Sequence, residues 1–163
     1  LIRDIVLHHR GDIAPRAEAL LYAADRAHHV ATHVRPALAR GEVVIQDRYL
    51  DSSVAYQGAG RVLDGGEIRD LSLWAAEGAL PDVTVLLDVD PATARDRLDA
   101  ADKPFDRLEA EKSAFHERVR AAFLALADAE PERFLVVDAT QPIEVIADAI
   151  RARVDERLST RSS

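Results

Sequence analysis

Short apolar runs and longer segments of helical periodicity alternate along the chain. Three runs show no internal alternation and are followed within two residues by an aspartate: Val43–Ile45, Val83–Leu87 and Phe134–Val137. Runs of this kind are typical of strands buried on both faces in a parallel sheet. Before the first run, apolar residues at helical spacing predict a long helix from Pro15 to Leu38, with Pro15 in its first turn and Gly41 as its stop.

Helical patterns also separate and follow the other runs. We expect helices at about Ile68–Glu77, from Pro91 onward, at about Arg107–Ala127 and at about Ile143–Leu158. Alternating strands and helices predict an α/β fold, with a parallel sheet of three visible strands and helices on both faces. Ligands of such folds bind beyond the carboxyl ends of the strands. We interpret Asp90 and Asp138 as caps of the helices that follow them, whereas Asp47 has a more informative context.

Composition narrows the class of protein. The 163 residues predict one domain, 1–163, and the net charge of -8 argues against a general nucleic-acid binder. No apolar run approaches eighteen residues, so no membrane span is expected, and without cysteine no disulfide is possible. The cytoplasm is therefore the expected compartment. The chain contains no methionine, even at position 1, so we expect the gene to start upstream of Leu1.

The pair Asp47-Arg48 carries the most specific chemistry. A carboxylate at the end of a buried strand stands where a Walker-B-type acid meets a magnesium–nucleotide complex. The adjacent guanidinium is a planar, permanently charged group suited to a phosphate. Together the two residues indicate phosphoryl transfer. Their spacing alone equally allows a local salt bridge.

The residues around this pair resemble a known family. The run Asp47–Gly58 is similar to the central motif of bacterial thymidylate kinases, in which Asp-Arg-Tyr precedes a serine-rich turn and Ala-Tyr-Gln-Gly. Collinear segments that resemble the same family are Pro15–Ala27, Pro81–Thr84, Leu87–Pro91, Asp106–Glu109 and Phe115–Val119. The resemblance implies a P-loop NTPase-like fold. We read the glycines at 58, 60, 65 and 66, on the sequence alone, as part of a flexible turn.

The resemblance also implies how the acceptor nucleotide is bound. Tyr22 stands where an aromatic ring stacks on thymine, and Arg26 where an arginine hydrogen-bonds the base. Ser53 and Gln57 occupy positions that help to read the base. Tyr56 matches a tyrosine that packs against the sugar and disfavours a 2′-hydroxyl.

Other positions concern phosphate and metal. Arg48 would hold the acceptor phosphate, and Asp47 would organise Mg²⁺ and the phosphate groups. Asp106 and Glu109 lie where acids approach Arg26 and the sugar in some members.

A lid is expected at about 98–107. Its candidate phosphate-stabilising residues are Arg97, Lys103 and Arg107, but the segment is more acidic than basic. No Gly-x-x-x-x-Gly-Lys-[Ser/Thr] motif for ATP phosphates occurs in the sequence. We therefore expect a further N-terminal segment in the native protein, and expect this chain to be inactive alone.

The resemblance implies transfer of the γ-phosphate of ATP to dTMP, giving dTDP and ADP, with Mg²⁺ bound to ATP and a homodimeric assembly. Two alternatives stay open. The first is a deoxynucleoside kinase, which shares the fold and an arginine after the strand-end acid. The second alternative is a non-catalytic nucleotide-binding or dimerisation module.

Overall fold

The computed structural model describes residues 2, 5–6, 12–100, 111 and 113–161. The chain folds as two compact units, which we describe separately. The first comprises Leu1–Leu80 and Pro104–Val119, and the second comprises Pro81–Lys103 and Arg120–Ser163.

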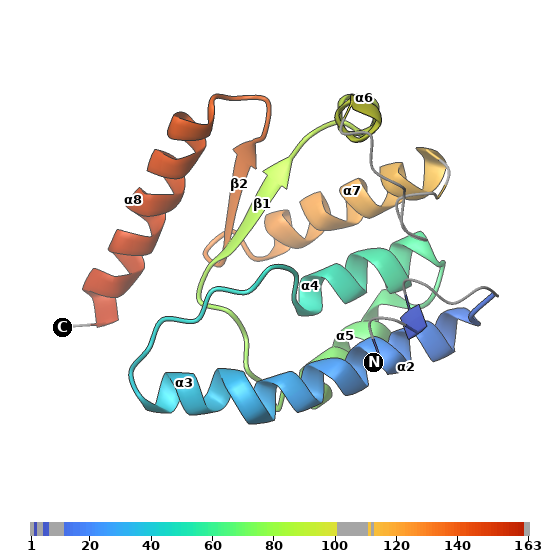
Figure 1. Ribbon diagram of the computed structural model, residues 1–163, viewed down its shortest axis with the longest axis horizontal. Helices are drawn as coiled ribbons and strands as arrows, with labels where there is room; N and C mark the ends of the chain where they lie inside the picture. The colour runs from blue at the N-terminus through green and yellow to red at the C-terminus, as the bar shows by residue number, and fades with distance from the viewer. Residues whose placement is uncertain (1, 3–4, 7–11, 101–110, 112, 162–163) are drawn as a thin grey trace. The chain divides into compact units, whose positions relative to one another are not determined.

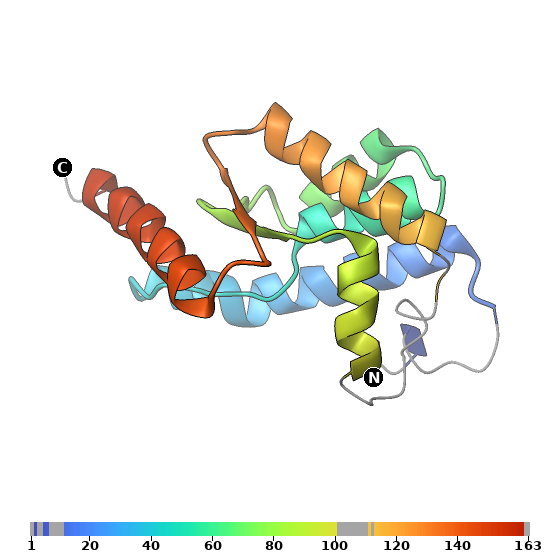
Figure 2. The ribbon, with the colours of Figure 1, turned by 90° about the horizontal axis from the view of Figure 1, so that it is seen from above.

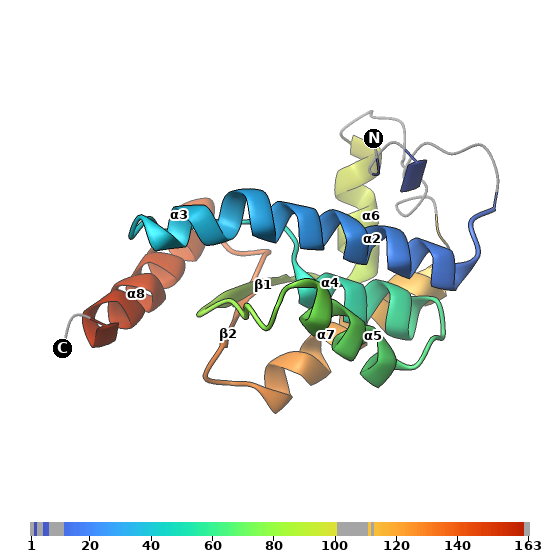
Figure 3. The same cartoon turned by 90° about the horizontal axis from the view of Figure 1, so that it is seen from below.

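The first unit is helical, and its longest feature is the predicted helix from Pro15. It consists of α2 (Pro15–His29), a π-helical segment η1 (Val30–Val34) and α3 (Arg35–Ala39), which follow one another without a break (Figures 1 and 3). Gly41 follows with a φ of 77° and donates its N–H to the Leu38 carbonyl, as expected of a helix stop. The prediction of one long helix is thus confirmed, with a π-helical turn inside it.

Pro36 gives a physical reason for that π-helical turn. Proline has no N–H, so a regular α-helix would leave an unpaired carbonyl one turn earlier and would clash with the proline ring. In η1 the hydrogen bonds widen, and the Arg35 N–H reaches the Val30 carbonyl. Val30 and Val34 stay buried against Ala76, so the widened turn still contributes to the core.

The strand expected at Val43–Ile45 does not form, which corrects the prediction of three strands. The segment has no strand hydrogen bonds in the structure. Val44 packs against the η1 cluster, whereas Val43 is 65% exposed and Ile45 is 94% exposed. Apolar composition alone cannot make a strand, because a strand is stabilised by a hydrogen-bonded neighbour, and the described residues provide none here.

Three further helical elements complete the described part of the first unit, together with the first turns of α7. The short helix α4 (Leu50–Ser53) passes directly into the π-helical segment η2 (Val54–Gly60), and α5 (Gly65–Ala75) follows. The Asp64 carboxylate accepts a hydrogen bond from the Glu67 N–H and so caps α5. In Figure 3, α5 lies beside α2, and the two helices are in contact.

The second unit contains the sheet. Strands β1 (Thr84–Asp88) and β2 (Phe134–Asp138) pair in parallel, with Thr84 opposite Phe134 and Asp88 opposite Asp138. The helices are α6 (Pro91–Ala100), α7 (Ser113–Ala129), whose first turns belong to the first unit, and α8 (Ile143–Arg161). Figure 2 shows α8 next to β2, which it contacts. The described sheet is therefore two-stranded and parallel, as in an α/β protein.

One of the two predicted helix caps forms, and the other acid stabilises a turn instead. Asp90 accepts hydrogen bonds from the N–H and hydroxyl of Thr93 at the start of α6. Asp138 accepts from the N–H and hydroxyl of Thr140, so it stabilises the turn after β2 rather than capping α8, which begins at Ile143. Both interactions stabilise the ionised carboxylates and lower their pKa values. Among the described helices, none has both the length and the apolar character needed to cross a membrane.

Candidate nucleotide-binding site

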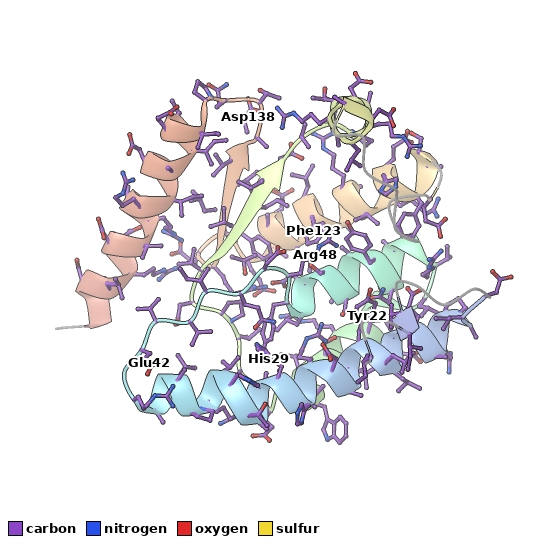
Figure 4. All side chains as sticks on the ribbon, in the orientation of Figure 1. Tyr22, His29, Glu42, Arg48, Phe123 and Asp138 are labelled. Atoms are coloured by element: carbon purple, nitrogen blue, oxygen red, sulfur yellow. The ribbon has the colours of Figure 1, made fainter. Side chains whose placement is uncertain are left out.

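One face of α2 contacts the segment that carries the predicted motif. Glu18, Tyr22 and Arg26 follow each other at intervals of four residues, which places them on the same side of the helix. Figure 4 shows Tyr22 on α2 and Arg48 in the segment that leads into α4. Each of the three α2 residues interacts with a different part of the stretch from Asp47 to Gly60, which we call the motif segment.

Arg48 has an unusual backbone conformation. Its φ of 62° lies in the left-handed region, which is uncommon for residues other than glycine. Such a conformation costs on the order of 1–3 kcal/mol and is often found at functional sites. It turns the chain between the irregular segment that contains Val44 and the helix α4. The guanidinium of Arg48 lies over the Tyr56 ring, with 4.8 Å between its Cζ atom and the ring centre.

The surroundings of Arg48 favour its charge. Partial desolvation lowers the pKa of its guanidinium, but Tyr56, Asp47 and Tyr22 together outweigh this and raise the pKa above the ordinary value. The contribution of Tyr56 includes a hydrogen bond as well as a charge interaction. Four predicted site residues, Asp47, Arg48, Tyr56 and Tyr22, thus belong to one electrostatic cluster.

Arg26 occupies a more buried position and is only 9% exposed. Its Nη2 donates to Ser53 Oγ at 2.8 Å and to the Tyr49 carbonyl at 3.4 Å, and its Nη1 donates to Ser72 Oγ at 3.2 Å. These partners are neutral. Burial therefore lowers the pKa of Arg26, although Tyr49, Asp51 and Asp25 oppose the effect. The structure brings Arg26 and Ser53 together, two residues that were predicted to read the same base.

Ser72 was not predicted, although the sequence contained a signal for it. It lies on the buried face of α5, together with Ile68 and Ala75, and is 2% exposed. A serine at a buried position of an apolar helical pattern requires a hydrogen-bond partner. The Ser72 hydroxyl accepts a hydrogen bond from the Arg26 guanidinium and so helps to orient the guanidinium.

Gln57 is buried in contact with a carboxylate that the sequence analysis also missed. It is 2% exposed, and its Nε2 donates to Glu18 Oε1 at 2.9 Å. Glu18 is fully buried and also lies 3.5 Å from Arg61 Nε. Arg61 forms a second ion pair at 2.5 Å with Glu111, and its guanidinium lies over the Phe115 ring. The signal for Glu18 was its spacing of four residues before Tyr22.

The motif segment is helical rather than a flexible turn, which corrects the interpretation of its glycines. In η2 the Arg61 N–H reaches the Tyr56 carbonyl and the Leu63 N–H reaches the Gly58 carbonyl, both π-helical bonds. A Cβ atom at Gly60 would lie 2.7 Å from Phe115 Cε2. The absence of a side chain at this position therefore allows α7 to pack closely against η2.

Arg118 on α7 secures the end of the same segment. Its Nε donates to the Ala59 carbonyl at 3.2 Å and its Nη2 to the Gly60 carbonyl at 2.9 Å. These last carbonyls of η2 lack partners within the helix. The side chain of Arg118 thus acts as a cap that holds the helix carrying Tyr56 and Gln57.

The remaining predicted residues concern the lid. Asp106, Glu109, Lys103 and Arg107 lie outside the described residues. Arg97 belongs to the second unit, where its Nη1 donates to the Ala139 carbonyl at 3.1 Å. Its role in a lid stays a prediction.

The described residues include no group of three or more His, Asp or Glu side chains arranged to hold a metal ion. Asp47 is exposed and next to Arg48. A single carboxylate fits an ion such as Mg²⁺ when nucleotide phosphates supply other ligands. The donor set is therefore compatible with a metal that is bound to a nucleotide, rather than with a metal held by the protein alone.

Comparison with known proteins identifies the family. Residues 1–150 match the family model described as thymidylate kinase. The chain is 76% identical over 157 residues to a thymidylate kinase from Leifsonia xyli subsp. xyli (strain CTCB07), covering 96% of this chain and 74% of the relative. It is 74% identical over 162 residues to the thymidylate kinase of Clavibacter michiganensis subsp. michiganensis (strain NCPPB 382), covering 99% and 77%.

A more distant relative gives the same result. The thymidylate kinase of Cutibacterium acnes (strain DSM 16379 / KPA171202) is 54% identical over 154 residues, covering 94% of this chain and 74% of the relative. The resemblance drawn from the motif segment is confirmed, and with it the α/β fold of the P-loop NTPases that the family implies. The chain belongs to the thymidylate kinase family.

Proposed function

We propose that the protein containing this chain transfers the γ-phosphate of ATP to dTMP and produces dTDP and ADP. Family membership supports the reaction class. The observation that carries the proposal is the position of Arg48, a cation in a left-handed backbone conformation beside Asp47 and over the Tyr56 ring. This is a preorganised cationic group of the kind that phosphoryl transfer requires.

In this proposal Arg48 binds the phosphate of the acceptor nucleotide. Its guanidinium can donate two parallel hydrogen bonds to phosphate oxygens, which fixes orientation as well as charge. Tyr56 restricts the guanidinium from one side through the ring contact at 4.8 Å. Since phosphoryl transfer depends mainly on positioning and electrostatic stabilisation, an arginine held in this way contributes to rate as well as affinity.

Arg26 and its neighbours bind the base. A guanidinium carries only N–H donors, so it favours a carbonyl acceptor such as O4 of thymine over the exocyclic amino group of cytosine. The bonds of Arg26 to Ser53 and Ser72 support this role because they fix the plane of the guanidinium. Tyr22 stacks on the base, and Ser53 and Gln57 contribute hydrogen bonds to it.

Tyr56 packs against the sugar and disfavours a 2′-hydroxyl, while Asp106 and Glu109 approach the sugar and Arg26. The location of Tyr56 between Arg48 and Phe115 supports its part of this proposal. Its ring centre is 5.9 Å from that of Phe115, in an edge-to-face arrangement. A ring fixed on two sides can act as a steric limit.

Binding of ATP, the phosphate donor, requires groups beyond the residues described. The 163 residues contain no Walker A motif, so we assign the ATP phosphates to no residue of this chain. Asp47 is the residue that would interact with Mg²⁺ brought by the nucleotide, and the ion would neutralise charge on the phosphates. Arg97, Lys103 and Arg107 are the candidates for stabilising the transferred phosphoryl group.

An acceptor panel tests this function. The full-length protein is incubated with ATP, Mg²⁺ and one acceptor at a time: dTMP, dUMP, dCMP, dGMP or thymidine. We expect kcat/KM to be highest for dTMP. Preferred phosphorylation of thymidine would support a deoxynucleoside kinase instead. Stabilisation by dTMP without turnover of any acceptor would support a non-catalytic nucleotide-binding module.

We also propose a homodimer located in the cytoplasm. Exposed apolar side chains on α2, α3 and α5 support an interface on these helices: Leu20 is 57% exposed, Leu38 is 47% exposed and Trp74 is 79% exposed. Sedimentation equilibrium of the full-length protein should give twice the monomer mass. Trp74→Ser should shift the equilibrium toward the monomer.

A further inference from the structure

Glu18 is a buried carboxylate in the first turns of α2. Its exposed fraction is 0%, and a buried charge is expensive unless it is paired and hydrogen-bonded. Its Oε1 accepts a hydrogen bond from Gln57 Nε2 at 2.9 Å. The same oxygen lies 3.5 Å from the Nε of Arg61. An acid in this position, next to a residue of the proposed base site, calls for an explanation beyond packing.

The distances from Glu18 Oε1 to Gln57 and to Arg61 indicate that these two neighbours have different roles. Arg61 lies closer to Glu111, with 2.5 Å between Nη1 and Oε1, than to Glu18. Arg61 therefore supplies countercharge to both acids but forms its shorter ion pair with Glu111. The shortest of these bonds to Glu18 comes from the amide of Gln57. Of these two groups, Gln57 is therefore the closer partner of Glu18.

An ionised carboxylate can only accept hydrogen bonds. The amide of glutamine carries a donor and an acceptor, and a rotation of 180° about its last bond exchanges them. A neighbour that only accepts removes this ambiguity. The NH₂ group of Gln57 must turn toward Glu18, and the carbonyl oxygen Oε1 must turn to the opposite side of the amide.

We propose that Glu18 is a positioning residue that fixes the Gln57 amide with Oε1 as the acceptor for the nucleotide base. The inference rests on the proposed function. An acceptor at this position pairs with the N3–H donor of thymine or uracil and opposes N3 of cytosine, which is itself an acceptor. Glu18 thereby makes the site selective for dTMP over dCMP without touching the nucleotide.

Two other features keep the orientation fixed. Gln57 belongs to η2, whose final carbonyls at Ala59 and Gly60 accept hydrogen bonds from Arg118. Glu18 belongs to α2, which contacts η2 and α5. The amide and the carboxylate are therefore carried by packed helices, so an exchange of donor and acceptor requires rotation of the amide itself.

The first test is Glu18→Gln in the full-length protein. This variant keeps the shape of the side chain but offers a donor as well as an acceptor, so either orientation of the Gln57 amide is satisfied. We expect KM for dTMP to rise about tenfold, kcat to change less than about threefold, and the dTMP/dCMP ratio of kcat/KM to fall about tenfold. Glu18→Asp keeps an acceptor-only group and should restore part of the ratio.

Glu111→Gln is the matched control. It also removes a carboxylate from Arg61, but it leaves the bond between Glu18 and Gln57 intact. We expect a lower melting temperature and an unchanged dTMP/dCMP ratio. If Glu18→Gln likewise lowers only the melting temperature and leaves the ratio and KM unchanged, Glu18 has a structural role alone and the proposal is wrong.

Gln57→Ala provides a test that does not depend on the folding of a Glu18 variant. It should lower the dTMP/dCMP ratio about as much as Glu18→Gln does, and the double variant should lose little more. An unchanged ratio in Gln57→Ala would overturn the proposal. Failure of the wild-type protein to prefer dTMP in the acceptor panel would instead count against the proposed function.

Discussion

The motif segment and the end of the two-stranded sheet each contain an aspartate next to an arginine, but in different settings. In the second unit Asp88 ends β1, and Arg120 binds both of its oxygens, at 2.7 and 2.8 Å. In the first unit Asp47 is exposed and is followed by Arg48, whose guanidinium lies over Tyr56. In one pair the two side chains bind each other directly, whereas in the other the arginine is held by Tyr56 and by its own backbone conformation.

The difference teaches how to distinguish structural from functional acid–arginine pairs. In the bidentate pair Asp88–Arg120, two N–H groups of the guanidinium bind the two carboxylate oxygens. Arg48 is oriented by the face of the Tyr56 ring and by one hydrogen bond to Tyr56, and other N–H groups of its guanidinium can bind a ligand. A φ of 62° at Arg48 adds backbone strain that a purely structural pair does not require.

The largest expected effect comes from Arg48→Ala in the full-length protein. Loss of a preorganised cation at the acceptor phosphate should lower kcat/KM for dTMP about a thousandfold or more. The melting temperature should change by less than a few degrees, because the substitution removes no buried apolar group. Steady-state kinetics and thermal unfolding provide the two measurements.

Arg120→Ala is the matched variant for the other pair. It should lower the melting temperature slightly and change kcat/KM by less than about threefold. If the two variants reduced activity equally, the distinction between a structural and a functional pair would be wrong.

The grouping of many candidate site residues was predictable because these residues are close in sequence. The interval between Tyr22 and Arg26 and the run from Asp47 to Gly58 both reflect local geometry, and the structure groups these residues as expected. Glu18 and Ser72 were missed because their roles depend on contacts between segments distant in sequence, 39 and 46 residues apart. Periodicity predicts which face is buried, but not which partner a buried polar group meets.

The fold was predictable to a similar degree. Apolar runs correctly predicted β1 and β2, and helical spacing correctly predicted the long helix from Pro15. The failure at Val43–Ile45 has a physical cause, since a strand requires a hydrogen-bonded neighbour that composition does not reveal. The π-helical turns were not predicted. The signal for η1 was Pro36 within a helical pattern, and the signal for η2 was Gly60, where α7 packs closely.

The second largest effect should come from Gly60→Ala. Its new Cβ atom would lie 2.7 Å from Phe115 Cε2 and 3.1 Å from Val119 Cγ2, so η2 or α7 must move. We expect a loss of about 1–3 kcal/mol in the free energy of unfolding, together with a lower affinity for dTMP. Chemical denaturation and calorimetric titration measure the two quantities.

Gly65→Ala is the control for this substitution. No atom lies within 4 Å of the Cβ position at Gly65, which begins α5. Alanine should therefore stabilise the protein slightly or have no effect. Equal destabilisation by both alanines would show that close packing of α7 on η2 does not hold the motif segment.

A smaller effect is expected for Tyr56→Phe. The phenyl ring can keep its contact with the Arg48 guanidinium, but the hydroxyl that hydrogen-bonds Arg48 is lost. We expect kcat/KM for dTMP to fall about tenfold, corresponding to one charge-assisted hydrogen bond. Unchanged kinetics would show that the ring alone positions Arg48. Ring packing, rather than hydrogen bonding, would then distinguish Arg48 from the Asp88–Arg120 pair.

The smallest effect concerns Asp88→Asn and its dependence on pH. Hydrogen bonds from Arg120 lower the pKa of Asp88 below its ordinary value of 3.8, although partial desolvation and the charges of Asp138 and Asp90 oppose the shift. A lowered pKa means that the folded state favours the ionised carboxylate. The stabilisation is therefore complete above the ordinary pKa, declines below it, and is lost once the pH falls through the folded value.

Because both side chains are partly exposed, the pair should contribute less than about 1 kcal/mol. At pH 7 the wild-type protein should melt about 2 °C above Asp88→Asn, and the difference should shrink in melting curves recorded below pH 4. Asp99→Asn, which removes a more exposed carboxylate 3.5 Å from Arg95, should shift the melting temperature by less than about 1 °C. A difference between Asp88→Asn and wild type that persisted unchanged at low pH would mean that packing, rather than the charge of Asp88, stabilises the end of β1. The Asp88–Arg120 pair and the Asp47–Arg48 pair would then differ only in the backbone conformation at Arg48.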